Sequence, residues 1–240
     1  MTKKRILLLI LTTLFLSVHS FSQQKKLNQL PSFDKYELHW GFYLGFNSSN
    51  YKLSYQKSDF QNTSIQIDSK IGFNIGLIAD MKIDNHFNLR LEPGLISNAN
   101  TINFIDGSGN DVFGSFTSTN IESTYLHIPL LLKYSALRLN NVKPYLIGGL
   151  SYDYNFSSNQ ESDEDNSSGQ FRTKSFNFMY EVGFGFDIYF HYFKLSPSIR
   201  GQFAVTNELH RDKKSVGGSP WTDPIELMES RSVFIKLAFE

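Results

Sequence analysis

Residues 176–190 read FNFMYEVGFGFDIYF and place a large apolar or aromatic side chain at every even-numbered position. The positions between them hold mainly small or polar residues, among them Asn177, Glu181, Gly183 and Asp187. An alternation with a period of two residues predicts a β-strand with one apolar face. Eight large residues in one row are rare in a soluble β-sandwich, so the segment favours a strand whose apolar face meets lipid.

The same alternation recurs along most of the chain. It predicts further strands at 38–47, 70–81, 87–95, 125–134, 143–154, 193–205 and 233–239. Together with 176–190 these make eight strands, and the closed antiparallel barrels of outer membranes have an even number. Two residues disturb the pattern. Leu131 breaks the alternation of its strand, and Pro93, which lacks an N–H donor, predicts a bulge or an irregular ladder.

The connections between the predicted strands are long and short in turn. The long ones cover 54–69, 98–120, 157–174 and 208–224, whereas the turns near Asn85 and Asn140 are short. This asymmetry is typical of outer-membrane barrels, which have short periplasmic turns and long external loops. We therefore expect an all-β protein, an eight-stranded antiparallel up-and-down transmembrane β-barrel over 37–240, with long extracellular loops and both termini in the periplasm.

The N-terminus has the features of an export signal. Lys3, Lys4 and Arg5 precede an apolar run and a small-residue site at Ser22, which predicts a signal peptide over 1–22, with a membrane-anchored N-terminus as the alternative. A periplasmic N-terminal segment over 23–36 would follow. Removing the signal leaves 20 basic and 23 acidic residues, a balance that gives no indication of nucleic acid as a partner. There is no cysteine, and no later apolar segment approaches the length of a helical membrane span.

The polar faces of the predicted strands turn toward the barrel interior, which side chains fill in an eight-stranded barrel. Both signs of charge occur on these faces, and buried charges have to be paired to be tolerated. We therefore predict a structural network in the lumen, formed by Asn74, Arg90, Glu92, Tyr145, Glu181, Asp187 and Arg200. A role of these side chains in transport or gating is the alternative.

None of the polar residues forms a pattern that predicts catalysis. Glu181 and Asp187 lie about 20 Å apart along one strand, too far to act on the same bond. A hydrolase built on a serine and His127 is an alternative without a supporting motif. The acidic loop at 161–166 could bind calcium but lacks the spacing of an EF-hand. We expect a non-enzymatic protein without catalytic, cofactor or metal sites.

Three stretches of the chain form recognisable motifs: LPSFDK at 30–35 leading into HWGFYLG at 39–45, YLHIPLLLKY at 125–134 and PYLIGG at 144–149. Together they resemble the PorT family of Bacteroidota outer-membrane barrels. The last two are shared by many small barrels of these bacteria, and the first points to PorT itself. The resemblance, which covers nearly the whole exported chain, implies an accessory or assembly component of type IX secretion, and of gliding motility where it is present. It implies no catalytic residues.

If the resemblance holds, the partners are outer-membrane lipid and other secretion-system proteins, contacted through the N-terminal segment and the long loops. The candidates for contact are Phe33, Asp34 and Lys35 in that segment, and Trp221 in the basic loop near the C-terminus. Trp221 could instead fold over the mouth of the barrel. The competing hypothesis is a stand-alone surface barrel for adhesion or small-ligand passage.

Overall fold

The computed structural model describes residues 28–55, 63–106, 118–158, 173–209 and 225–240. The predicted signal peptide, the acidic loop at 161–166 and Trp221 lie outside these residues. In chain order the elements are the 3-10 helix η2 (Phe33–Lys35) and the strands β1 (Leu38–Tyr55), β2 (Thr63–Ser69), β3 (Ile71–Lys82), β4 (Phe87–Leu91), β5 (Gly94–Asp106), β6 (Ser118–Ser135), β7 (Val142–Asn155), β8 (Phe176–Tyr189), β9 (Lys194–Ala204) and β10 (Ile225–Phe239). No helix in the described ranges is long and apolar enough to span a membrane.

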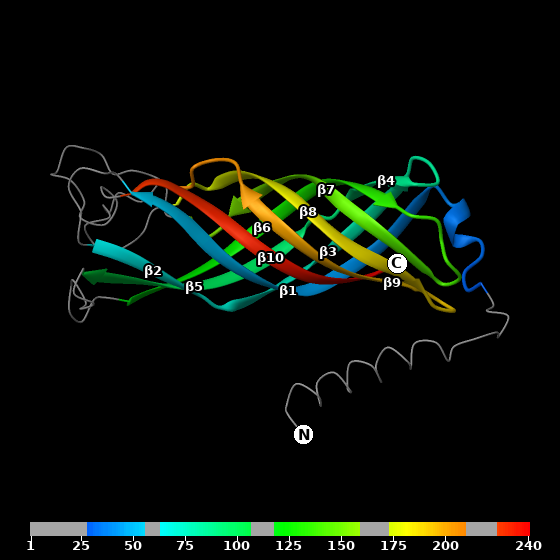
Figure 1. Ribbon diagram of the computed structural model, residues 1–240, viewed down its shortest axis with the longest axis horizontal. Coiled ribbons are helices and arrows are strands. Elements are labelled where there is room, and N and C mark those ends of the chain that lie inside the picture. Colours follow the sequence, from blue (N-terminus) through cyan, green and yellow to red (C-terminus); the bar gives the residue numbers. More distant parts are fainter. Residues whose placement is uncertain (1–27, 56–62, 107–117, 159–172, 210–224) are drawn as a thin grey trace, which may run out of the picture.

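The strands form one closed antiparallel ring (Figure 1). β2 and β3 are one pass of the chain divided at Lys70, and β4 and β5 are another pass divided at Glu92 and Pro93. β1 pairs with β10 on one side and with β3 on the other, which closes the ring. The prediction of an all-β, up-and-down barrel with a ring of eight strands is therefore confirmed.

Pro93 interrupts the sheet without shifting it. Leu91 faces Leu130 on one side of the gap and Gly94 faces His127 on the other, so the register with β6 is unchanged. A proline has no N–H to donate, and a local break in the ladder follows from this. Of the two possibilities that the sequence left open, the structure therefore has the irregular ladder and not the bulge.

At one end of the barrel the strands extend further than the sequence predicts. Residues 63–69 and parts of 98–120, predicted as loop, belong to β2, β5 and β6. β10 likewise begins at Ile225, well before the predicted start at Val233. The predicted extent of these loops is wrong because the extensions are rich in Ser, Thr and Asn. The apolar residues at alternate positions in them come only in short pairs, such as Ile65 and Ile67 or Ile102 and Phe104, which are too few to reveal a strand.

The two ends of the barrel differ in their connections. The end at the right of Figure 1, called the turn end here, carries the short turns 83–86, 136–141 and 190–193, together with η2 and Glu240. The opposite end, called the loop end, carries the connections that follow β1, β5, β7 and β9. The short connections are thus gathered at one end.

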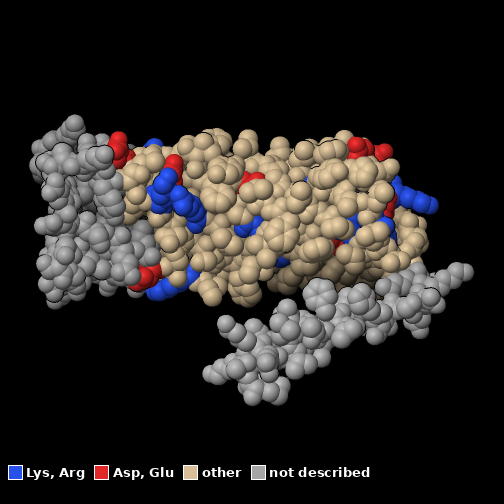
Figure 2. Space-filling view, viewed as in Figure 1, with Lys and Arg blue, Asp and Glu red and all other residues tan. Residues whose placement is uncertain are grey.

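Apolar side chains cover the middle of the outer wall. Trp40, Leu77 and Leu150 are exposed by 70%, 66% and 66%. Figure 2 shows a mainly uncharged surface along the middle of the barrel, with most visible charges toward its two ends. A soluble monomer rarely exposes an apolar patch larger than a few hundred Å². An apolar band around a closed barrel is the surface that contacts lipid in a membrane.

Two glycines on the inner wall make room for buried tyrosines. A Cβ at Gly94 would overlap the hydroxyl of Tyr43, and a Cβ at Gly185 would lie 2.5 Å from the hydroxyl of Tyr145. Both tyrosines are buried inside the barrel. The glycines therefore allow aromatic rings to cross an interior that is too narrow for two facing side chains.

Candidate functional site

Charged side chains, in place of an apolar core, fill the lumen. Among the described residues, the carboxylates of the charged clusters are those of Asp80, Glu92, Asp153, Glu181, Asp187 and Glu240, and the buried cations are Arg90, Lys133, Lys194, Arg200 and Lys236. Removing a charge from water is costly unless an opposite charge and hydrogen bonds replace the water. The pairing of these groups therefore decides whether the barrel is stable and whether anything can pass through it.

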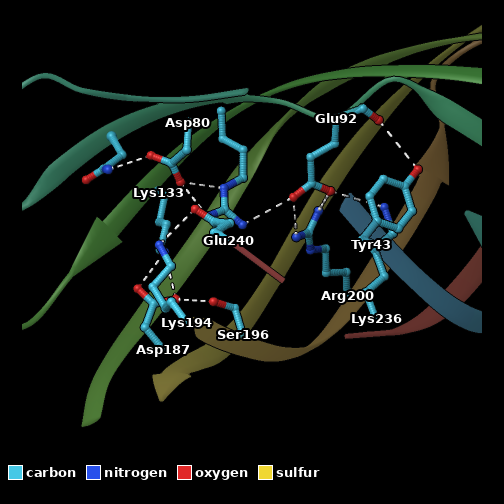
Figure 3. Close-up of polar contacts among 12 residues, drawn as sticks. Tyr43, Asp80, Glu92, Lys133, Asp187, Lys194, Ser196, Arg200, Lys236 and Glu240 are labelled. Carbon is cyan, nitrogen blue, oxygen red and sulfur yellow. Dashed lines mark hydrogen bonds and ion pairs between the residues drawn. The ribbon is translucent and has the colours of Figure 1, made fainter. Parts of the chain in front are cut away.

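Glu92 is the centre of the middle cluster (Figure 3). Its two carboxylate oxygens accept hydrogen bonds from Nη1 and Nη2 of Arg200 at 2.7 and 2.9 Å. Lys236 Nζ and Arg90 Nη1 each lie 3.4 Å from the same carboxylate. Lys236 also lies over the ring of Tyr43, 4.4 Å from its centroid. One carboxylate thus holds three cations contributed by β4, β9 and β10.

A second cluster lies toward the turn end (Figure 3). Arg90 donates from Nε to Asp80 at 2.6 Å and from Nη2 to Glu240 at 2.6 Å, and Lys194 pairs with Glu240 at 2.8 Å. The cluster joins the C-terminal residue of the chain to β3, β4 and β9. It therefore ties the last strand to the first half of the barrel.

Lys133 and Asp187 form a further pair at the same level. Lys133 Nζ donates to both carboxylate oxygens of Asp187, at 2.9 and 2.6 Å, and the hydroxyl of Ser196 donates to Asp187 at 2.6 Å. The Lys133 ammonium also lies over the ring of Tyr145, 4.2 Å from its centroid. Both charges are thereby satisfied by side chains of four consecutive strands, β6 to β9.

His127 lies between two carboxylates toward the loop end. Its Nδ1 lies 2.6 Å from Asp153 Oδ1 and its Nε2 lies 2.9 Å from Glu181 Oε1, although the second contact is an ion pair without hydrogen-bond alignment. A carboxylate only accepts hydrogen bonds, so a bare ring nitrogen facing either one would be repelled. With both carboxyl groups ionised, the geometry therefore favours protons on both nitrogens. The resulting imidazolium balances the six carboxylates against six cations.

All seven residues of the predicted lumen network are buried in the barrel interior. Asn74 lies apart from the charges and donates to Asn47 Oδ1 at 3.3 Å. The other six belong to the clusters described above or contact them. The predicted set does not include Asp80, His127, Lys133, Asp153, Lys194, Lys236 and Glu240, which complete the pairs. Each of these residues is separated by an even number of positions from the other inward-facing residues of its strand, and this alternation could have identified them.

These clusters close the lumen. Two cavities in it have volumes of about 10 and 20 Å³. A volume of this size holds about one water molecule. At these two places in the lumen the side chains therefore leave room for little more than a water molecule.

The N-terminal residues 28–36, called the cap here, fold back across the turn end. Phe33 stacks on His39 with 4.1 Å between ring centroids, and Lys194 Nζ lies 4.7 Å from the Phe33 centroid. The Phe33 ring also meets the edge of Tyr189 at 5.9 Å. The Phe33 ring therefore points toward the barrel and covers part of its opening at the turn end, next to the turn-end cluster.

Polar contacts attach the cap to the turns of the barrel. Asp34 accepts a hydrogen bond from the Tyr189 hydroxyl at 2.9 Å and pairs with Arg138 at 3.3 Å. Arg138 also donates to the carbonyls of Gln29 and Leu30. Of the predicted contact residues, Phe33 and Asp34 are thus engaged with the barrel, and Lys35 is exposed.

Glu208 is a buried carboxyl at the loop end, beyond the apolar band that begins on β10 at Val233. It accepts hydrogen bonds from the Ser230 hydroxyl at 2.5 Å and from the Ser230 N–H at 3.4 Å. Burial raises the pKa of Glu208 to about 7, and the two bonds from Ser230 oppose this rise. The carboxyl holds the segment before Leu209 against β10, where Leu209 packs on Met228.

Glu208→Gln is expected to change how the stability of this segment depends on pH. The native carboxyl keeps its proton between about pH 4.5 and 7, where the unfolded chain loses it, so native stability falls as pH rises through this window. At pH 8 the variant should be more stable by up to about 3 kcal/mol, and at pH 4 the two should be similar. Hydrogen-exchange protection of the Ser230 amide measures this, and parallel pH profiles would contradict it.

No group of three or more His, Asp or Glu side chains in the described ranges has the geometry of a metal site. The clusters are pairs of opposite charge that satisfy one another. Such an arrangement stabilises a protein interior. His127 is held between two acids.

A closed eight-stranded ring with an apolar outer band and a charged, filled interior defines a transmembrane β-barrel of the outer-membrane class. A family model described as the outer membrane protein beta-barrel domain matches residues 21–210. The chain belongs to this family, and it is an outer-membrane β-barrel protein that lies in the lipid bilayer. No curated protein matches the sequence.

Solved outer-membrane proteins with a similar fold share little sequence with the chain. OprG from Pseudomonas aeruginosa is 12% identical, over 85% of this chain and 95% of that chain, with a TM-score of 0.48. AlkL, solved in lipid bilayers, is 14% identical, over 91% and 93%, with a TM-score of 0.43. Ail, the attachment invasion locus protein of Yersinia pestis, is 11% identical, over 85% and 97%, with a TM-score of 0.37.

Proposed function

We propose that this protein is a non-conducting, non-enzymatic barrel that serves as an accessory or assembly component of type IX secretion, and of gliding motility where it occurs. The observation that carries the proposal is the filled lumen, in which Glu92 holds three cations across the barrel axis. A barrel that transports no solute functions through contacts made at its two ends. The assignment to type IX secretion rests on the resemblance to PorT, which is found in the segments at 30–35, 39–45, 125–134 and 144–149.

In this proposal residues 1–22 are removed as a signal peptide, 23–36 form a periplasmic segment and 37–240 form the barrel. The turn end then faces the periplasm, and the loop end faces outward, as in barrels of this class. Lys35 and Tyr36 are exposed on the outer side of the cap, and Tyr36 is exposed by 65%. Lys35 and Tyr36 are therefore available for contact with other secretion proteins. Phe33 and Asp34 are not, because they are bound to the barrel.

Deleting the gene tests the secretion role. We expect secreted cargo to remain inside the cell, and the native gene to restore its export. Complementation with Lys35→Glu and Tyr36→Ala together should fail although the barrel inserts normally, because this change affects only the exposed side of the cap. The matched control is Lys70→Glu, an exposed lysine at the loop end. Normal secretion in the deletion strain would refute the proposal.

The second candidate is a stand-alone surface barrel for adhesion. The observation that favours it is the length of β1 and β6, which are 18 residues each and extend beyond the apolar band at the loop end. It predicts that changes at the loop end alter surface binding and leave secretion unchanged. Small-ligand passage predicts steady conductance through the purified barrel in a planar bilayer, and the filled lumen predicts none.

A further inference from the structure

The cap and the barrel enclose a small polar cavity at the turn end, called the cap cavity here. Its volume is about 20 Å³, and Phe33 and Asp34 of the cap form one side of it. The barrel supplies most of the other lining side chains, among them Lys82, Lys133, Ser135, Lys143, Asp187 and Lys194. A space of this volume admits a single water molecule or a monatomic ion.

Positive charge exceeds negative charge around the cap cavity, which is lined by four lysines and two aspartates. Both aspartates already have a cation, since Asp187 lies 2.6 Å from Lys133 and Asp34 lies 3.3 Å from Arg138. Lys194 has a carboxylate of its own outside the lining, that of Glu240. The remaining two lysines, at positions 82 and 143, therefore carry the excess charge.

Lys82 and Lys143 have no carboxylate partner within the described ranges. Lys82 Nζ donates to the Asp34 carbonyl at 2.7 Å, and an ammonium group has two further protons to donate. Lys143 makes neither a hydrogen bond nor an ion pair with its ammonium group in the described part of the chain. Both side chains are partly buried, and a charge that leaves water requires a charge of opposite sign.

Ser135 adds a neutral donor to the same cavity. Its side chain is 1% exposed, and its hydroxyl has no hydrogen-bond partner among the described residues. Buried polar atoms are nearly always hydrogen-bonded, so a buried hydroxyl without a partner indicates a ligand or a water molecule. The three groups come from the last residue of β3, the last residue of β6 and the start of β7.

We propose that the cap cavity binds one monatomic anion, chloride, between Lys82, Lys143 and Ser135. The anion accepts hydrogen bonds from the two ammonium groups and the hydroxyl, and it supplies the negative charge that the lining lacks. A water molecule has a suitable size but brings no charge. Phosphate and carboxylate groups contain several heavy atoms and exceed the volume of the cavity. The site is independent of any role in secretion.

A bound anion would also hold the cap against the barrel, because cap residues form one side of the cavity. A ligand that binds only the closed form raises the population of that form by a factor of one plus the ratio of its concentration to its dissociation constant. At ten times the dissociation constant the cap should therefore open about tenfold less often. This effect should be specific for halide and should not follow ionic strength.

Bromide identifies the site directly, because it replaces chloride and scatters X-rays anomalously. In crystals of the full barrel grown with sodium bromide we expect an anomalous peak inside the cap cavity. Lys143→Met should abolish this peak, and Ser135→Ala, which removes a donor without changing the charge, should weaken it. The matched control is Lys35→Met, the same substitution at an exposed lysine of the cap, and it should retain the peak.

Hydrogen exchange tests the consequence in solution. The amides of Phe33, Lys35 and Tyr36 donate within the cap, and their exchange is compared in sodium chloride and sodium gluconate at equal ionic strength. Saturating chloride should slow it about tenfold or more in the native barrel and in Lys35→Met, and should have no effect in Lys143→Met. A cavity without a bromide peak, a peak that persists in Lys143→Met, or equal exchange in the two salts would each overturn the proposal.

Discussion

Replacing Glu92 with glutamine is expected to lower the free energy of unfolding by about 3–5 kcal/mol, the range for removing one partner of a buried ion pair. The carboxylate lies in the lumen between Arg200, Lys236 and Arg90. The amide has nearly the same size, so packing is retained and the change isolates the charge. Arg200 and Lys236 would then lose their nearest carboxylate while Arg90 keeps Asp80 and Glu240, and the two unbalanced buried cations are why we expect the largest effect here.

Urea titration of the barrel in lipid vesicles, followed by tryptophan fluorescence, measures this loss. The control is Glu229→Gln, which removes a carboxylate that pairs with Lys52 at 3.7 Å on the partly exposed surface. Exposed pairs of this kind contribute about 1 kcal/mol or less. Equal midpoints for the two variants would show that the central cluster is not what holds the strands together.

His127→Gln is expected to cost about 3 kcal/mol, at the lower end of the same range. Asp153 and Glu181 would lose the cation between them, and Glu181 would keep only its 4.0 Å contact with Arg200. Combining the change with Asp153→Asn and Glu181→Gln removes the excess negative charge. This triple variant should therefore be more stable than the single one, although it contains more substitutions.

Nitrogen NMR of the labelled histidine ring in bilayers checks the charge directly. The geometry predicts that both nitrogens of His127 carry a proton at neutral pH. His191 at the turn end, whose Nδ1 lies 3.1 Å from the Gln29 side chain, provides a comparison in the same spectrum. A spectrum with one unprotonated nitrogen at His127 would mean that a proton lies on Asp153 or Glu181 instead.

The alternation of side chains predicted the ring because it reports which face of each strand meets lipid. It works wherever that face is apolar over many residues, as at Phe184 or Leu77, and it fails in 63–69, where Ile65 and Ile67 are the only apolar residues. The same alternation separates inner from outer residues. It does not show which inner residues meet, because that depends on the register between strands.

The ion pairs illustrate this limit. Arg200 and Glu92 are 108 positions apart in the sequence, and their contact follows from the staggering of strands around the ring. Lys133 follows Leu131, a buried leucine on the inner face that conceals the polar pattern of β6. The cap was not predicted because η2 has no periodic pattern, and its contacts are made with side chains that the barrel brings together.

The cap also has a consequence for the order of assembly. Asp34 meets Arg138 and Tyr189, which are 104 and 155 positions further along the chain. The surface that receives the first described residues therefore exists only after β6 to β9 have associated. Contacts between such distant positions form late in folding. Residues 28–36 are therefore expected to gain their contacts last, so protection of this segment from a protease would report that the ring has closed.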